Sequence, residues 1–205
     1  MAPASAPSAP AVPARSRAAA LPPEERRALI VQAVLPLFLE RGGAVTTREV
    51  AQAAGIAEGT IFRVFADKNE LIDAVVDAAL DPAPVEAALA AIDPTPPFEE
   101  RLVAAADILR ARVAYVFRVI SMASDFAGGR RPATRPPIEL RELVALFERE
   151  SHRLRCSPSE AAHLLRGLTF SGTHSSFIVG EPLTSEEIVS VLLDGIRHES
   201  WRRPC

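Results

Sequence analysis

Apolar residues recur at helical spacing along nearly the whole chain after residue 21, and this periodicity constrains the fold more than any other feature. Leu, Ile, Val and Ala residues three and four positions apart form stripes from Leu29 to Phe38 and from Leu71 to Leu80, and similar stripes continue to Ile196. Such spacing gathers apolar side chains on one face of a helix. No segment carries a convincing β-hairpin signal. The sequence therefore predicts an all-α fold.

Prolines, glycines and acidic residues mark where the expected helices begin and end. The first helix is expected to start at Pro22-Pro23 and to stop before Gly42-Gly43, because proline suits a helix start and glycine a helix end. Further breaks fall at Asp81-Pro82, Pro94 to Pro97, Gly128 to Pro137, Ser157-Pro158 and Gly180 to Leu183. The later long helices are expected over about residues 98–124, 138–155, 159–179 and 184–201. Short helices are thus predicted first and long ones later.

Composition places the chain among ordinary globular proteins. The 205 residues are 48% hydrophobic and 24% charged, which is enough to bury a core without metals or disulfides. Residues 1–21, rich in Ala and Pro, offer little apolar area, so we expect a flexible arm there. Cys156 and Cys205 lie too far apart to suggest a disulfide framework or a zinc site. The longest apolar run, residues 29–39, is too short to span a bilayer, and we expect a cytoplasmic protein without a membrane partner.

The net charge of −3 argues against a protein that is basic over its whole surface, but it leaves room for a local basic patch. All the basic residues but one are arginine, and the exception is Lys68. No nucleophile–base pair, metal cluster or phosphate-binding loop is visible, so we expect neither an enzyme nor a cofactor.

Residues 45–71, VTTREVAQAAGIAEGTIFRVFADKNEL, are the most informative segment. Thr46 and Glu49 form a capping box that predicts a helix start at Thr47. Gly55 follows that helix where a left-handed turn residue is needed. A second short helix is expected over residues 58–65, and Asp67 begins a third. Two short helices joined through a glycine turn and packed on a longer helix make a helix-turn-helix unit.

The position of each side chain in such a unit suggests a role in binding DNA. Thr47, Thr60 and Lys68, near helix starts, would contact phosphates. The exposed side of the second helix would face the major groove, with Arg48 reaching in from the helix before it. Base-edge readers would then be Arg48, Glu58, Gly59, Phe62 and Arg63, and either arginine could pair with guanine.

Taken together, these residues resemble the DNA-binding domain of the TetR/AcrR family of bacterial transcriptional regulators. The resemblance is close over residues 29–80 and rests on the combined pattern Thr46 to Ala51, Ala54 to Ile56, Gly59 to Phe62, Phe65, Lys68 and Leu71. It implies DNA contacts at Thr46, Thr47, Arg48, Glu58, Gly59, Thr60, Phe62, Arg63 and Lys68. It also implies a DNA-binding domain at residues 22–70, followed by a larger helical effector-binding and dimerisation domain at residues 71–205.

Several positions depart from the family pattern. Phe62 stands where the family usually has tyrosine, Val64 replaces tyrosine or histidine, and Ala57 replaces a serine cap. Glu58 occupies a position that is frequently basic or neutral, and there it could accept from cytosine N4 or remain a solvated surface charge. These departures keep open an alternative function, that of a helical small-molecule-binding protein with weakened or lost DNA binding.

Useful specificity generally needs two copies of a helix-turn-helix on neighbouring half-sites, so we expect a homodimer. The last two long helices are the candidate interface, because one carries small residues that allow close approach and the other supplies apolar area. The interface set is Gly167, Leu168, Ser171, Ser175, Ile188, Val191, Leu192 and Ile196. The other interpretation is that these residues face their own subunit's core.

The resemblance further implies a small-molecule effector bound among the middle helices. Candidate pocket residues are Tyr115, Phe117, Met122, Phe126, Phe147, Phe170 and His174, although aromatic residues at helical spacing more often belong to a core. His163 and His174 lie eleven residues apart without matching acidic or cysteine ligands, so we expect no metal site. The predicted function is that of a transcriptional repressor, which a small-molecule effector releases from double-stranded operator DNA.

Overall fold

The computed structural model describes residues 22–41, 44–126, 138–173, 178 and 180–197, and it leaves out the side chains of Phe38 and Phe126. Its α-helices are α1 (Pro23–Arg41), α2 (Thr47–Ala53), α3 (Glu58–Val64), α4 (Lys68–Leu80), α5 (Ala83–Ala90), α6 (Phe98–Phe126), α7 (Arg141–Glu148), α8 (Pro158–Thr173) and α9 (Ser185–Ile196). The only β-type pairing among the described residues is an isolated antiparallel bridge between Leu154 and Arg197. The all-α prediction is confirmed.

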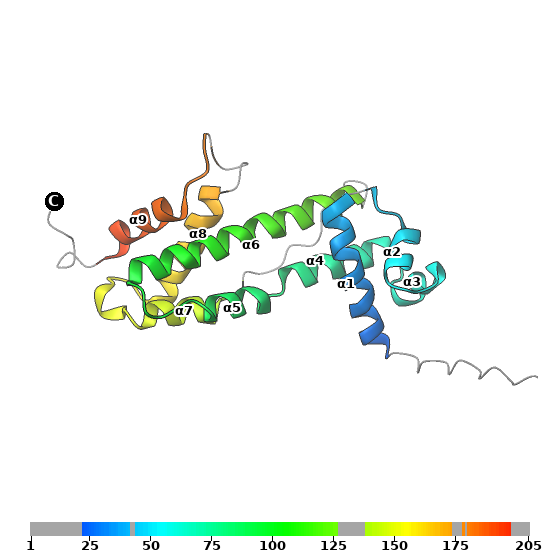
Figure 1. Cartoon of the computed structure of the whole chain (residues 1–205), viewed down its shortest axis with the longest axis horizontal. Coiled ribbons are helices and arrows are strands. Elements are labelled where there is room, and N and C mark those ends of the chain that lie inside the picture. Colours follow the sequence, from blue (N-terminus) through cyan, green and yellow to red (C-terminus); the bar gives the residue numbers. More distant parts are fainter. Residues whose placement is uncertain (1–21, 42–43, 127–137, 174–177, 179, 198–205) are drawn as a thin grey trace, which may run out of the picture.

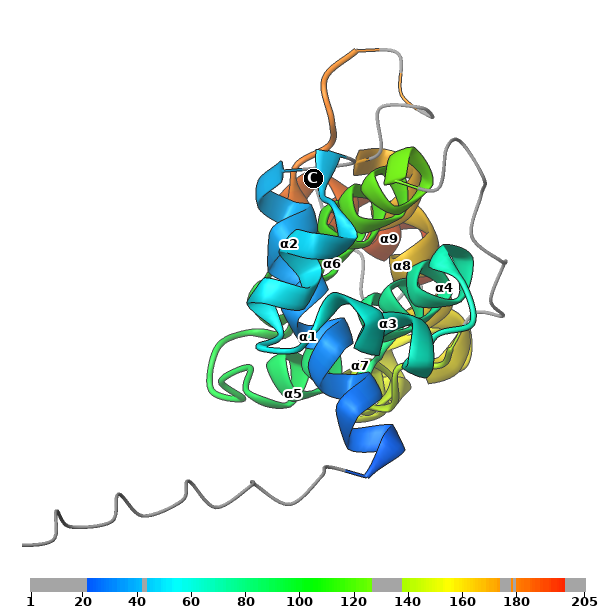
Figure 2. The same cartoon turned by 90° about the vertical axis from the view of Figure 1, so that its right-hand side faces the viewer.

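The molecule is elongated, with two groups of helices at the ends of α6 (Figure 1). One group, which we call the head, consists of α1, α2, α3 and α4. The other, which we call the body, consists of α5, α7, α8 and α9 with the first half of α6. Seen end-on, α1, α2 and α3 stand at the front of the molecule, so the head is open to solvent on its outer side (Figure 2).

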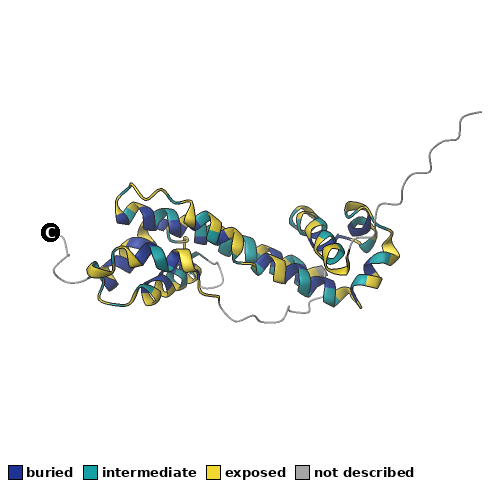
Figure 3. Ribbon diagram, turned by 90° about the horizontal axis from the view of Figure 1, so that it is seen from below, coloured by how far each residue is buried: buried dark blue, intermediate teal, exposed yellow. Residues whose placement is uncertain are grey.

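Each end of the molecule has its own hydrophobic core, and α6 contributes to both. The body core takes Leu102, Ala106 and Leu109 from the first half of α6. The head core takes Val119 and Ala123 from its second half, and neither of these two residues is exposed to solvent. Buried residues accordingly line the inner sides of the helices at both ends of α6 (Figure 3). One long helix thus fastens the head to the body.

The head core does not stop at residue 70, where the sequence places the end of the DNA-binding domain. Ile72, Val75 and Val76 of α4 are buried in the head core, where α4 packs against α1 and α6. Because these residues and the second half of α6 complete the core, residues 22–70 hold only part of the apolar surface that keeps the head folded. The proposed domain limits of 1–21, 22–70 and 71–205 remain predictions.

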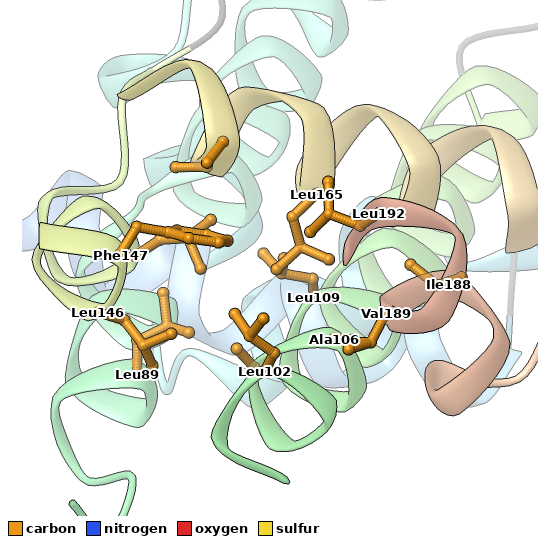
Figure 4. Packing of buried hydrophobic residues seen from close by; sticks show 14 of the residues in the cluster. Leu89, Leu102, Ala106, Leu109, Leu146, Phe147, Leu165, Ile188, Val189 and Leu192 are labelled. Atoms are coloured by element: carbon orange, nitrogen blue, oxygen red, sulfur yellow. The ribbon is translucent and has the colours of Figure 1, made fainter. Parts of the chain in front are cut away.

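The body core packs side chains from five helices around Phe147 (Figure 4). Phe147 is fully buried and meets Phe98 edge to face, with ring centroids 5.8 Å apart. Leu165 of α8 and Leu192 of α9 close the core from the other side. Burying a side chain of this size contributes about 1.5–3 kcal/mol relative to leaving it exposed.

Two sequence-based helix boundaries in the body are corrected by the structure, and one helix was not predicted. The single helix expected over residues 138–155 is instead the short α7 followed by a 3₁₀ turn, Ser151–Arg153. The helix expected over residues 184–201 has its last helical residue at Ile196, because Arg197 turns into extended backbone and pairs with Leu154. Helix α5 was not predicted, because its apolar residues other than Val85 and Leu89 are alanines and one proline, which give no clear apolar stripe. The expected order of short helices before long ones is also wrong, since α1 has 19 residues and α7 has eight.

An ion-pair cluster surrounds the turn that follows α7. Glu150 accepts hydrogen bonds from Arg101 at 2.9 Å and from Arg153 at 3.2 Å. Glu99 of α6 accepts from Arg153 at 3.2 Å and from Arg197 at 2.7 Å. These contacts join the start of α6, the 3₁₀ turn and the end of α9, and all of them except Arg153–Glu150 link residues about fifty to a hundred positions apart in the chain. No local sequence pattern encodes the long-range contacts.

No helix among the described residues is both long enough and apolar enough to cross a membrane.

Candidate nucleic-acid interface

The first helix of the helix-turn-helix begins at the predicted capping box. The Thr46 hydroxyl accepts from the Glu49 backbone N–H at 3.3 Å, and the Glu49 carboxylate accepts from the Thr46 N–H at 2.9 Å. The bond from the Thr46 backbone is the main cause that holds the pKa of Glu49 below its ordinary value. Glu49 is also paired with Arg41 at the end of α1. The cap therefore fixes both the start of α2 and its attachment to α1.

A glycine turn then sets the direction of α3. Gly55 has a φ of +67°, the left-handed conformation that the sequence predicted for it. Ala57 precedes α3 and has no side-chain cap, as expected for alanine at this position. Ile61 and Phe65 point into the head core and are at most 1% exposed. The opposite face of α3 is consequently turned outward.

The outer face of α3 carries the residues that the sequence analysis assigned to base reading. Glu58, Gly59, Phe62 and Arg63 are all exposed, and Phe62 is 51% exposed. Arg48, near the start of α2, is exposed as well. Within the described part of the chain, neither Arg48 nor Arg63 makes an ion pair. An exposed phenyl ring beside unpaired guanidinium groups is an arrangement suited to a groove of DNA.

One hydrogen bond links the starts of the two short helices. The Thr47 hydroxyl donates to Glu58 Oε1 at 2.6 Å. The Thr47 hydroxyl was predicted to contact a phosphate; its bond to Glu58 was not predicted, since the two residues lie eleven positions apart. The Thr46 hydroxyl is likewise engaged with Glu49. The hydroxyl protons of both threonines are therefore already used within the protein.

Helix α4 begins at Lys68, which was predicted to lie at a helix start. Asp67 caps α4 by accepting from the Glu70 N–H at 2.9 Å, and Lys68 is exposed. Glu70 accepts from the Ala66 N–H and from Arg27 of α1, each at 2.6 Å. The Ala66 bond is the first of the causes that keep the pKa of Glu70 below its ordinary value. Glu70 thereby holds the start of α4 against α1.

The structure does not bring the predicted pocket residues together. Tyr115 and Met122 lie against the head core, whereas Phe147 is buried in the body core. Among the described pocket candidates, Phe117 and Phe170 contact each other, with ring centroids 5.4 Å apart. His174 and the Phe126 side chain lie outside the described residues. A cavity of about 150 Å³ lies elsewhere, between α7 and α8, and is lined by Ile138, Glu139, Leu140, Val144, Ser159, Ala162, His163 and Arg166.

The predicted dimer residues divide into two sets. Ile188, Leu192 and Ile196 are at most 5% exposed because they pack into the body core. Their assignment to a dimer interface is therefore wrong. Gly167, Ser171 and Val191 are exposed and Leu168 is half-buried, while Ser175 lies outside the described residues. Leu164 and Phe170, which were not in the predicted interface set, are 44% and 40% exposed on α8.

Fold and site together define a helical protein whose N-terminal helix-turn-helix head stands on a larger helical body. Residues 30–75 match the family model for bacterial regulatory proteins of the tetR family. The HTH-type transcriptional repressor Rv3405c of Mycobacterium tuberculosis is 44% identical over 55 residues, which are 26% of this chain and 29% of the repressor. The repressor KstR2 of the same species is 37% identical over 57 residues, 27% of this chain and 28% of KstR2. The chain thus spans less than a third of the length of these curated relatives.

The fold extends the similarity beyond the head. A TetR-family transcriptional regulator from Haemophilus influenzae superposes with a TM-score of 0.52 and 16% identity, covering 85% of this chain and 98% of the other. At this identity the likeness concerns the fold alone. Similarity in sequence to the tetR family of bacterial regulatory proteins therefore covers residues 30–75, and the rest of the chain is similar in fold.

Proposed function

We propose that this chain is a DNA-binding transcriptional regulator that represses its target genes and leaves operator DNA when a small-molecule effector binds. The observation that carries the proposal is the outward face of α3, where Phe62 and Arg63 are exposed on a helix whose inner face is locked into the head core. The repressors similar over the head segment support the same function.

The head offers both phosphate contacts and base contacts, and specific DNA binding requires both kinds. Lys68 and Thr60 would contact phosphates, which position a protein on the duplex without reading its sequence. Arg48 and Arg63 would pair with guanine in the major groove, and Phe62 would contact a thymine methyl group. Because Phe62 has no hydroxyl, it adds apolar contact and no phosphate bond.

Two copies of the chain would hold two heads on neighbouring half-sites. The surface we propose for this dimer is the exposed set on the last two helices, namely Leu164, Gly167, Phe170, Ser171 and Val191. We call it the α8–α9 face. Gly167 leaves open space around its Cα, which would let a partner helix approach closely.

The effector would act through α6, because that helix is part of both cores. A ligand that binds best to an arrangement in which the distance between the two heads of the dimer does not match the two half-sites must lower the affinity for DNA. By linkage, DNA must lower the affinity for that ligand by the same factor. The predicted pocket residues and the α7–α8 cavity are the sites to examine for ligand contact.

Selection from genomic DNA tests the proposed function. The purified chain should retain specific genomic fragments, and its affinity should fall as salt rises because phosphate binding releases counterions. Arg48→Ala and Lys68→Ala should each weaken binding by roughly tenfold. Arg149→Ala is the matched control, since Arg149 is exposed in the body, far from the head in sequence.

Failure to retain any sequence selectively would overturn this function. If such a chain still bound small apolar molecules, the alternative of a ligand-binding protein without DNA binding would replace it.

A further inference from the structure

Glu58 is an unusual residue to find on a surface that faces DNA, and the structure shows what holds it there. It is the first residue of α3, it is exposed, and it accepts a 2.6 Å hydrogen bond from the Thr47 hydroxyl. Among the described residues it makes no ion pair. Its negative charge is therefore not neutralised by a neighbouring arginine or lysine in the described part of the chain.

The bond from Thr47 gives the Glu58 carboxylate a defined place. A solvated glutamate on a helix surface samples several rotamers, whereas one held by a short hydrogen bond between two helices is restricted. With Oε1 bound to Thr47, Oε2 remains available to accept from a donor outside the protein. The carboxylate thus presents an oriented acceptor at the edge of the base-reading face.

Among the four bases, this acceptor matches cytosine best. The major-groove edge of cytosine presents the N4 amino donor, and the carboxylate can accept from it. Guanine presents two acceptors, O6 and N7, which would repel a carboxylate. Adenine presents its N6 donor beside the N7 acceptor, so only part of its edge is favourable, and thymine offers an acceptor and a methyl group.

We propose that Thr47 and Glu58 act as one unit that selects cytosine at one position of each operator half-site and rejects guanine there. This inference rests on the proposed DNA-binding function and specifies part of its sequence preference. Thr47 serves as a positioning residue that acts through Glu58 and does not serve as a phosphate anchor. The acidic residue at position 58, where a basic or neutral residue is frequent in the family, would then determine base preference.

Selection from a randomised pool of double-stranded DNA tests this inference. The full-length protein should enrich cytosine at one position of each half-site. Glu58→Gln should shift that position toward adenine, because glutamine pairs bidentately with adenine N6 and N7. Glu58→Ala should lose the preference and bind unrelated DNA more tightly, since a negative charge near the phosphates is gone.

Two further variants separate positioning from charge. Thr47→Val removes the hydroxyl at similar size and should reduce the cytosine preference about tenfold, while Thr47→Ser should restore it. Glu186→Gln removes the same charge from an exposed position on α9 and should leave base preference unchanged. Circular dichroism would confirm that each variant keeps its helical content.

The outcomes distinguish this inference from the proposed function. If the wild-type chain enriches a sequence and Glu58→Gln and Glu58→Ala enrich the same one, the cytosine unit is refuted while the DNA-binding function stands. If the wild-type chain enriches no sequence, both are refuted.

Discussion

Single hydroxyl and carboxylate groups determine where the helices of the head begin. Thr46 with Glu49 starts α2, and Asp67 with the Glu70 N–H starts α4. A side chain that satisfies an otherwise unpaired N–H at a helix start stabilises the helix by about 1 kcal/mol. These short-range contacts are visible in the sequence, which is why the starts of both helices could be predicted to the residue.

The capping box makes the stability of the head depend on pH. The pKa of Glu49 lies below its ordinary value of 4.5, so the stabilisation is fully present above that pH and is lost as the pH falls through the lower, folded-state pKa. Thermal unfolding of the wild type and of Glu49→Gln should therefore differ most near neutral pH, and the difference should shrink below about pH 4.5.

Thr46→Ala provides the companion measurement, because it removes the other half of the cap and should cost about 1 kcal/mol at neutral pH. A difference between wild type and Glu49→Gln that stayed constant down to about pH 3 would show that the charge of Glu49 does not stabilise the cap.

At the scale of helices, sequence periodicity identified apolar faces but could not tell what each face covers. Ile188 and Leu192 form the apolar stripe of α9 that was assigned to a dimer, yet they pack into their own body core. Periodicity also extended α7 too far, because the turn that follows α7 is held by ion pairs with distant residues, Arg101–Glu150 and Arg153–Glu99. Contacts of such long range leave no signal in a local window of sequence.

The Arg101–Glu150 pair should be the most sensitive point of that turn. The Arg101 side chain is 9% exposed and that of Glu150 is 18% exposed, so removing one partner leaves the other buried with less compensation. Arg101→Ala should lower the free energy of unfolding by up to about 3 kcal/mol. The loss should not be larger, because Arg153 still donates a hydrogen bond to Glu150.

Denaturant unfolding measures this loss, with Arg149→Ala as the control for a nearby exposed arginine, expected to stay within about 0.5 kcal/mol of wild type. Equal effects of the two substitutions would mean that the cluster does not stabilise the connection between α7 and α8.

At the scale of the whole molecule, the proposed function depends on assembly. Leu164 and Val191 are exposed apolar residues of the α8–α9 face, at 44% and 54%. Replacing both by Asp should turn a dimer into a monomer, because each buried carboxylate would lack a partner. Affinity for a complete operator should then fall by roughly a hundredfold, since the advantage of two linked heads is lost.

Ile138→Asp is the control, because Ile138 is 46% exposed but lies before α7, outside the α8–α9 face. Analytical ultracentrifugation reports the assembly state directly. A double variant that remained dimeric would place the interface on another surface.

The division of α6 between two cores also bears on how readily heads could be exchanged among related proteins. A segment cut anywhere between α4 and α6 would leave behind Val119 and Ala123, which close the head core. In a chimera that received only the helix-turn-helix from a related protein, the inner side of the transferred helices would have to pack against the recipient's own α6. Substitutions on the inner side of the head are thus tied to the composition of the second half of α6, whereas the outer residues of α3 can vary without contacting that helix.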